Sequence, residues 1–324
     1  MRMRNFLFLV TVLAVAMMPG CDKEIDSTVF EQQENRYFEL YKDANFPDAV
    51  PTESGLYFLE DSVGTGASPD SGDYLLVNYV AYTVPDEMVV DTYSEDWAID
   101  YNIYTSGVLY GPYKYLHGSE IEGLKEGVSM MKEGGIARLV FKSELGYGSA
   151  GIGNNIGAYE SLMYDVQLLE VIKDASLKEF NQIKAYLDSA GNYITIFDED
   201  TDANMYYFPD VIGQGEPIVD DDVLEVYYTG QLLDGRVFDT NVGDETGLDV
   251  TLGEEAVIQG WEIGLTYFNY GGTGKLLIPH PLAYGEEGNL LSGSLKYSIP
   301  PYEALLFDIQ IEPQSEAEEP EVEE

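Results

Sequence analysis

Residues 257–268 read VIQGWEIGLTYF, and residues 121–131 read IEGLKEGVSMM. Each stretch sets two glycines among apolar side chains, and Leu124 in the earlier stretch stands where Trp261 stands in the later one. In the later stretch apolar residues follow Trp261 at i+4 and i+7, so the three lie on one face of a helix. The sequence therefore predicts that one short amphipathic helix occurs twice in the chain.

Further matches in the same order indicate that a longer unit is duplicated. The five pairs are Tyr79 with Tyr228, Asp91 with Asp239, Leu124 with Trp261, Tyr147 with Tyr284, and Asp165 with Asp308. The first copy has eleven extra residues between Asp91 and Leu124, and the second has six extra between Tyr284 and Asp308. Length changes of this kind are expected in surface loops.

Each copy reads as strands rich in Val, Tyr, Leu and Ile, separated by Gly, Asp and Pro turns and interrupted by one short helix. Such a unit buries its helix best when an antiparallel sheet wraps around it. The sequence therefore predicts an α+β fold with two tandem domains of this kind.

A further helix is expected before each copy. Residues 176–192, SLKEFNQIKAYLDSAGN, begin with Ser176 and Glu179 in capping-box spacing and carry apolar residues on one side. Residues 27–41, STVFEQQENRYFELY, precede the first copy in the same way. We therefore expect each unit to carry its own N-terminal helix.

The first twenty residues are organised like a secretory signal peptide. Two arginines precede the apolar run FLFLVTVLAVAMM, and Pro19 and Gly20 then lead to Cys21, the only cysteine. The run is short for a membrane-spanning helix. Cys21 resembles the acylated cysteine of a bacterial lipoprotein, although a plain signal peptide with a stray cysteine is an alternative. We expect an extracytoplasmic protein, lipid-anchored to a bacterial membrane in the periplasm or at the cell surface.

The chain is strongly acidic. Its 324 residues include 16 Lys and Arg against 59 Asp and Glu, a formal net charge of −43, and removing residues 1–20 makes it −45. This charge argues against nucleic acid as a partner. Seven glutamates between Glu312 and Glu324 predict a disordered, solvated tail over residues 314–324.

Metal and cofactor chemistry is weakly indicated. His117 and His280 lie in different repeats, and no cysteine-rich zinc spacing is present, so we expect structural or exposed roles for both histidines. Residues 198–204, DEDTDAN, begin like a calcium loop, but Ala203 stands where a glycine is required. Pro209 also replaces the bidentate glutamate, so an acidic turn is the better interpretation and no cofactor or metal is expected.

Four segments of the second copy resemble the FK506-binding-protein (FKBP) type of peptidyl-prolyl cis/trans isomerase. They are VYYTGQLLDGRVFDT, LGEEAVIQGWEIGL, GGTGKLLIPHPLAYG and IPPYEALLFDIQI, in the order and spacing of the family. The resemblance implies a pocket with catalytic candidates Tyr228, Phe238, Asp239, Trp261, Tyr284 and Phe307 and substrate-binding candidates Val257, Ile258 and Ile299. Leu248 stands where the family prefers a large aromatic side chain.

The implied chemistry needs neither a nucleophile nor a metal. Rotation about a peptide bond is opposed by ~18–20 kcal/mol, and an X-Pro bond isomerises unaided in roughly tens to hundreds of seconds. A dry, apolar pocket that binds the twisted amide better than the planar forms speeds this rotation. We expect Trp261 beneath the proline ring, Tyr284 as a donor to a substrate carbonyl, and Asp239 either orienting Tyr228 or meeting the twisted carbonyl.

The first copy departs from this pattern, and we expect a degenerate site there. It keeps Tyr79, Asp91 and Tyr147. However, Val90 replaces the wall phenylalanine, and Leu124 replaces the tryptophan. Gly157 and Ala158 stand where the second copy has Pro300 and Pro301, and Tyr164 stands at the Phe307 position. A scaffold or peptide-binding role is therefore expected for the first copy, with isomerase activity mainly in the second.

The sequence thus predicts a peptidyl-prolyl isomerase that assists the folding of envelope proteins and binds proline-containing segments and, through a lipid anchor, a membrane. The alternative is a non-catalytic chaperone or peptide-binding module of a cell-envelope assembly. The expected organisation is a signal peptide at 1–20, a linker and helix at 21–52, a degenerate FKBP-like domain at 53–172, a linker helix at 173–204, an isomerase domain at 205–313 and a tail at 314–324.

Replacing the acylation site tests the predicted anchor. Cys21→Ala removes the thiol that would carry lipid, so the protein should move from the membrane fraction to the soluble fraction when cells are lysed and centrifuged. Retention of the variant on membranes at the wild-type level would contradict the lipoprotein prediction.

Overall fold

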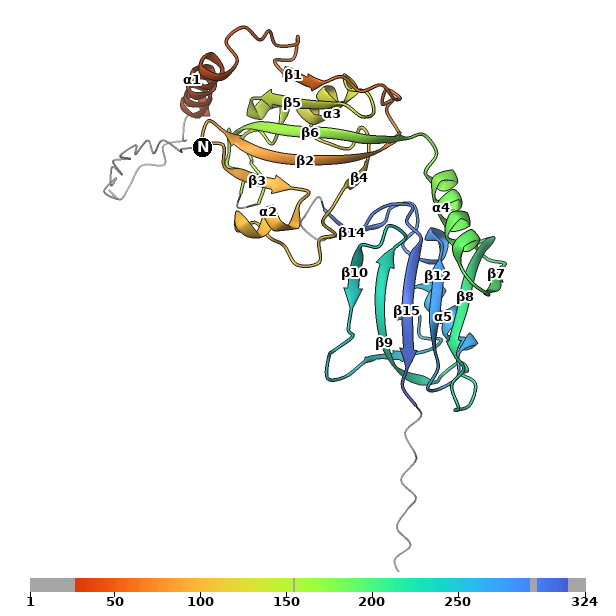
Figure 1. Cartoon of the computed structure of the whole chain (residues 1–324). Helices are drawn as coiled ribbons and strands as arrows, with labels where there is room; N and C mark the ends of the chain where they lie inside the picture. The colour runs from red at the N-terminus through yellow and green to blue at the C-terminus, as the bar shows by residue number, and fades with distance from the viewer. Residues whose placement is uncertain (1–26, 154, 292–295, 314–324) are drawn as a thin grey trace, which may run out of the picture.

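The computed structural model describes residues 27–153, 155–291 and 296–313, and these form two domains joined by a helix (Figure 1). The predicted signal peptide, Cys21 and the acidic tail lie outside these ranges. Within the described part of the chain, no helix is long and apolar enough to cross a membrane.

The first domain is built on a six-stranded antiparallel sheet in the order β1-β5-β6-β2-β3, with β4 paired to β2. Its strands are β1 (Tyr57–Ser62), β2 (Tyr74–Val84), β3 (Val89–Thr92), β4 (Tyr113–Leu116), β5 (Ile136–Phe141) and β6 (Ser161–Ile172). Its helices are α1 (Ser27–Asn45), α2 (Glu95–Asp100), α3 (Glu122–Ser129) and the 3-10 helix η1 (Ser143–Leu145).

The second domain repeats this plan in a seven-stranded sheet of order β10-β9-β15-β12-β8-β7, with β11 paired to β9. Its strands are β7 (Ile194–Asp198), β8 (Ala203–Val211), β9 (Val223–Leu232), β10 (Val237–Thr240), β11 (Leu248–Thr251), β12 (Thr273–Ile278) and β15 (Leu305–Ile311). A separate pair is β13 (Asn289–Leu290) with β14 (Tyr297–Ile299). The helices are α4 (Ala175–Ser189), α5 (Gln259–Gly264), η2 (Leu265–Tyr267) and η3 (His280–Leu282).

The two sheets confirm the predicted duplication and fold class. The order β1-β5-β6-β2-β3 of the first sheet corresponds strand for strand to β8-β12-β15-β9-β10 of the second, and β4 corresponds to β11. Strand β7 is an additional edge strand, and it lies in the segment expected as part of the linker. The sheet of the second domain therefore begins upstream of residue 205.

Paired glycines bring the short central helix of each domain close to its sheet. A Cβ atom added at Gly127 of α3 would lie 2.5 Å from the Leu139 side chain on β5, and one at Gly264 of α5 would lie 2.5 Å from Leu276 on β12. Leu139 and Leu276 are fully buried. Because only glycine leaves this space, the helix backbone rests directly on the sheet side chains.

The helix expected before each copy is present, and it packs on the face of the sheet opposite the central helix. Phe38 of α1 packs with Val140 and Met163 in the first domain. Ile183 of α4 packs with Leu277, which follows Leu276 and faces the other way because strand side chains alternate. Each sheet therefore lies between two helices.

Each outer helix also places a glutamate on a 3-10 helix of its own domain. Glu34 of α1 accepts hydrogen bonds from the Ser143 backbone N–H at 2.6 Å and hydroxyl at 2.8 Å, and from the Ser161 hydroxyl at 2.7 Å. In the second domain, Glu179 of α4 accepts one from the His280 backbone N–H at 2.7 Å and also binds its ring Nδ1. The outer helix is thus part of the duplicated unit.

The predicted capping box at the start of α4 is wrong. The N-cap residue is Asp174, whose carboxylate accepts a hydrogen bond from the Leu177 N–H at 2.8 Å. Ser176 lies inside the helix, and Glu179 is turned away to His280. Glu179 therefore contacts His280, which is distant in the sequence, and does not cap the start of α4 as the local pattern implied.

The extra residues of the first copy do not form a simple surface loop. They include α2, with Trp97, and continue to Leu109, which packs against the core of the second domain. The Leu109 N–H also donates a hydrogen bond to the Tyr297 carbonyl at 3.1 Å. The insertion is therefore part of the contact between the domains.

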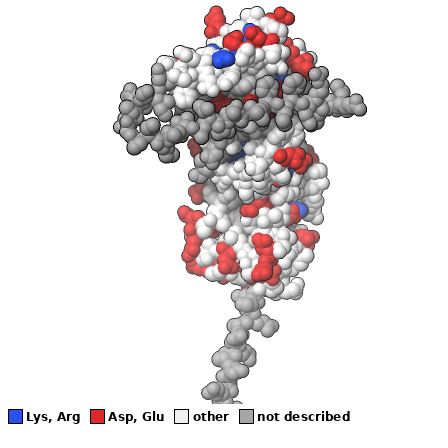
Figure 2. Space-filling model, turned by 90° about the vertical axis from the view of Figure 1, so that its left-hand side faces the viewer, with Lys and Arg blue, Asp and Glu red and all other residues white. Residues whose placement is uncertain are grey.

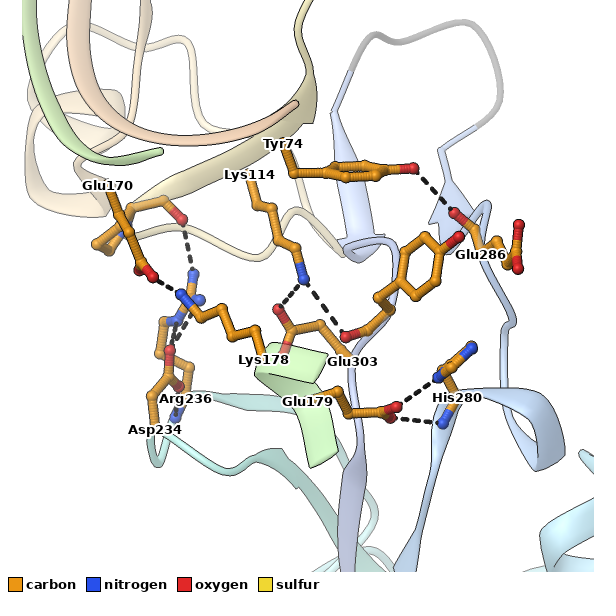
Figure 3. A network of polar contacts seen from close by, with 12 residues as sticks. Tyr74, Lys114, Glu170, Lys178, Glu179, Asp234, Arg236, His280, Glu286 and Glu303 are labelled. Carbon is orange, nitrogen blue, oxygen red and sulfur yellow. Dashed lines mark hydrogen bonds and ion pairs between the residues drawn. The ribbon is translucent and has the colours of Figure 1, made fainter. Parts of the chain in front are cut away.

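Polar side chains strengthen this contact (Figure 3). Lys114 of β4 pairs with Glu303 at 3.0 Å, and both side chains are largely buried. Arg236 donates to the Pro112 carbonyl at 3.1 Å. Burial raises the pKa of Glu303, and the ammonium group of Lys114 opposes that rise. The ion pair thus offsets part of the cost of burying this carboxylate between the domains.

Loss of the α1 glutamate should destabilise the first domain. Glu34→Ala leaves partly buried donors of Ser143 and Ser161 without their acceptor, so we expect the free energy of unfolding to fall by ~2–3 kcal/mol. Glu31→Ala, on the exposed side of α1, is the matched control and should change it by less than ~0.5 kcal/mol. Equal stability of the two variants in urea titration would refute the assigned role of Glu34.

Candidate functional site

Four aromatic side chains of the second domain form a cluster at one end of α5. Trp261 meets Tyr228 edge to face, with ring centroids 5.0 Å apart and planes at 90°, and meets Phe307 at 5.2 Å and 81°. Phe238 approaches Phe307 at 5.6 Å and 86°. These edge-to-face pairs are favourable for aromatic rings and fix their orientations.

The elements that carry the cluster are brought together by the sheet and its helix. Tyr228 comes from β9, Phe238 from β10, Phe307 from β15 and Trp261 from α5. A Cβ atom at Gly230 of β9 would lie 2.5 Å from the Phe238 ring, so this glycine leaves the space that the ring occupies. Trp261 and Phe307 are almost fully buried, whereas Tyr228 and Phe238 are only partly buried.

The polar groups of the site lie at its edge. The Tyr228 hydroxyl donates a hydrogen bond to Asp239 at 2.6 Å. Burial, together with the bond to Asp239, raises the pKa of Tyr228 well above its ordinary value. Burial and then the charge of Asp239 also raise the pKa of Tyr284, which is 37% exposed. Both hydroxyls therefore remain protonated and able to donate at neutral pH.

The remaining predicted residues belong to the core of the same domain or pack against it. Val257 and Ile258 pack against the domain core from the start of α5, and Ile299 on β14 is buried in it. Leu248 is 39% exposed. The indole N–H of Trp261 is buried without a hydrogen-bond partner. Of the nine predicted site residues, five thus contact one another directly, and Tyr284 lies close enough to Tyr228 and Asp239 to interact with them electrostatically.

The equivalent region of the first domain contains a cavity of about 360 Å³. The lining includes the predicted residues Tyr79, Asp91, Leu124, Tyr147 and Tyr164. The Tyr79 hydroxyl donates to Asp91 at 2.8 Å, as Tyr228 does to Asp239. The first domain therefore has both the tyrosine–aspartate pair and a substantial, partly open cavity.

Sequence reasoning missed two tyrosines of this cavity, Tyr113 and Tyr115 of β4. Tyr113 pairs with Val77 on β2 as Leu248 pairs with Val226 on β9, so it supplies the aromatic side chain that the second domain lacks. Strand alternation in the sequence YKYL, which puts both tyrosines on one face, was the available signal.

The cavity is completed by residues of the second domain, which sequence reasoning also missed. They are Leu290 of β13, Lys296 just before β14 and Tyr297 of β14, and all three line the cavity. We call these three residues the cap. Nothing in the local sequence indicates this contact, because it depends on how the two domains pack.

The histidines take structural positions in the two repeats. His117 contacts Glu120 at 2.5 Å through Nδ1 and Ser129 at 2.9 Å through Nε2, and it is buried. His280 binds Glu179. Asp198 accepts a hydrogen bond from the Thr201 N–H at 2.9 Å within the β7–β8 turn. Among the described residues, no group of His, Cys, Asp and Glu is arranged to hold a metal.

Two antiparallel sheets, each wrapped around a glycine-containing helix beside a tyrosine–aspartate pair, define a tandem protein of one repeated domain type. A model of the family described as FKBP-type peptidyl-prolyl cis-trans isomerase matches residues 66–169 and 214–312. These segments make up more than half of the chain, and the chain belongs to this family.

Several curated proteins are similar to parts of the chain. A probable FKBP-type peptidyl-prolyl cis-trans isomerase of Haemophilus influenzae is 37% identical over 111 residues, which is 34% of this chain and 43% of that protein. An FK506-binding protein of Neisseria meningitidis is 36% identical over 97 residues, which is 30% of this chain and 84% of that protein. The chain spans less than half of the length of the first curated relatives that it matches.

Solved structures also show similarity. The crystal structure of FkpA from Escherichia coli has 28% sequence identity and a TM-score of 0.37, and the match covers 46% of this chain and 62% of that one.

Quenching of tryptophan fluorescence tests the enclosure of the second-domain site. Trp261 is 3% exposed and Trp97 is 41% exposed, and the chain has no other tryptophan. We expect acrylamide to quench a Trp97→Phe variant, which retains Trp261, much less than the matched Trp261→Phe variant. Equal quenching of the two variants would show that Trp261 is open to solvent.

Proposed function

We propose that the second domain catalyses cis/trans isomerisation of X-Pro bonds in polypeptides. The observation that carries this proposal is the packed cluster of Trp261, Tyr228, Phe238 and Phe307 with Asp239 at its edge. Membership of the FKBP-type isomerase family supports the same reaction.

The cluster suits a reaction in which an amide loses resonance. A proline ring seated over Trp261 and beside Phe238 lies among apolar side chains, where the less polar twisted amide is favoured over the planar forms. Tyr284, exposed at the edge and protonated at neutral pH, is placed to donate to a substrate carbonyl. Asp239 holds the Tyr228 hydroxyl.

We further propose that the clients are proline-containing segments of envelope proteins and that the protein reaches them from a lipid anchor at Cys21. The support is the signal-peptide pattern that ends at this cysteine. On the face drawn in Figure 2, acidic side chains lie over both domains and basic side chains are few. This charge favours protein clients over nucleic acid.

A non-catalytic chaperone or peptide-binding role is the second candidate. Two observations favour it: Leu248 replaces an aromatic wall in the second domain, and Leu124 replaces the tryptophan in the first. In that case both sites would hold proline-containing segments without speeding their isomerisation.

An isomerisation assay on prolyl peptides decides between these functions. The protein without residues 1–20 should accelerate isomerisation, and Trp261→Ala and Phe238→Ala should each lower kcat/KM by ~10- to 100-fold. This loss corresponds to removing about 1.5–3 kcal/mol of aromatic contact from the transition state. Phe180→Ala, which removes an exposed aromatic ring from α4, should leave the rate unchanged.

Circular dichroism and thermal melting must show that each variant folds. If the folded wild type accelerates none of several X-Pro peptides but binds them, the chaperone or peptide-binding role replaces the isomerase. If it accelerates them and the two site variants do so equally well, the reaction occurs elsewhere in the chain.

A further inference from the structure

A lysine of the second domain contacts the aspartate of the first-domain site. Lys296 forms an ion pair with Asp91, and its ammonium group donates a hydrogen bond to the Thr92 carbonyl at 3.1 Å. The same ammonium lies 5.3 Å from the centre of the Tyr110 ring, within range of a cation–π interaction. Lys296 and Asp91 side chains are only 19% and 31% exposed.

The next residue, Tyr297, is an aromatic that lies on the same site. Its ring centroid is 6.1 Å from that of Tyr113, with the planes inclined at 33°, and its carbonyl accepts the hydrogen bond from Leu109. Cation and aromatic ring thus occupy adjoining parts of the first-domain surface, one at the carboxylate and the other at the tyrosines.

The carboxylate of Asp91 is well prepared for a cation. One oxygen accepts from the Tyr79 hydroxyl at 2.8 Å, and the other accepts from the Thr92 N–H at 2.7 Å as well as pairing with Lys296. These bonds fix the carboxylate before any ligand arrives. A pre-organised, partly desolvated carboxylate gives a stronger ion pair than an exposed one.

We propose that the first-domain site binds polypeptide segments in which a basic residue is followed by an aromatic one, and that Lys296 and Tyr297 occupy it as an intramolecular ligand of this class. A segment from another protein takes their place when the cap leaves. The site thereby recognises a charge and a ring, and it does not depend on isomerisation in the second domain.

The cavity also contains free space that the cap side chains do not fill. The volume of about 360 Å³ is free while the cap residues are in place. The Tyr115 hydroxyl lines this space and is buried without a hydrogen-bond partner. A basic segment is also attracted over a distance by the net charge of −43. Space, an available polar group and charge all favour a cationic–aromatic segment.

The intramolecular ligand should compete strongly with any free peptide. A segment tethered within the same chain acts at an effective concentration on the order of millimolar. A free peptide with an intrinsic Kd of about 100 µM should therefore bind the wild type at least ~10-fold more weakly than it binds a protein whose cap side chains are removed.

The test uses the full mature chain with Lys296→Ser and Tyr297→Ser combined, and the probe acetyl-Lys-Tyr-Ser-Ile-amide, which is the sequence of residues 296–299. Isothermal titration calorimetry should show that the probe binds the double variant at least tenfold more tightly than it binds the wild type. Adding Asp91→Asn to the double variant should weaken binding of the probe about tenfold. Raising the salt concentration should weaken this binding by a similar factor.

Two controls make the result specific. Lys275→Ser breaks an ion pair with Asp308 elsewhere in the second domain and should leave the weak wild-type binding unchanged. The probe with Met in place of Lys should bind the double variant at least tenfold more weakly. The proposal is overturned if the folded double variant does not bind the probe, or binds both peptides equally, or is unaffected by Asp91→Asn.

Discussion

The close contact between the central helix and the sheet is the constraint on which both sites depend. Glycines in α3 and α5 leave no side chain between the helix backbone and residues such as Leu139 and Leu276. The residue beside the first glycine, Leu124 or Trp261, is then held over the end of the sheet where the tyrosine–aspartate pair lies. A Cβ atom at these glycines would push the helix away and open the site.

Around this shared frame the two copies have diverged in opposite directions. The second domain fills its site with Trp261 and Phe307 and has Leu248 at the edge, whereas the first has Leu124 and a ring of tyrosines around an open cavity. Their aspartates accept the same tyrosine bond, but Asp91 also pairs with Lys296. The same backbone thus supports a cluster of packed aromatic rings in one copy and a tyrosine-lined cavity with an interdomain ion pair in the other.

Much of the fold was predictable because its signals are local. Five matched residue pairs located the duplication, and the motifs named the four aromatic residues and the aspartate that contact one another in the second domain. Whether these residues bind substrate stays a prediction. The missed contacts join residues far apart in the chain: Glu179 with His280, Leu109 with the second core, and Lys296 with Asp91. Spacing in the sequence carries no information on such contacts, and at α4 it pointed to the wrong cap because Asp174 and Ser176 offer competing local patterns.

The two places where the copies differ in length are the two that meet. The extra residues after Asp91 bring Leu109 to the second core, and those after Tyr284 bring Lys296 to the first site. A head-to-tail contact between identical repeats could continue from molecule to molecule into a filament. Here the first copy contributes the insertion with Leu109 and the second copy contributes the insertion with Lys296, so the two insertions meet within a single chain. Divergence in length has therefore placed the two complementary parts of the contact within one chain.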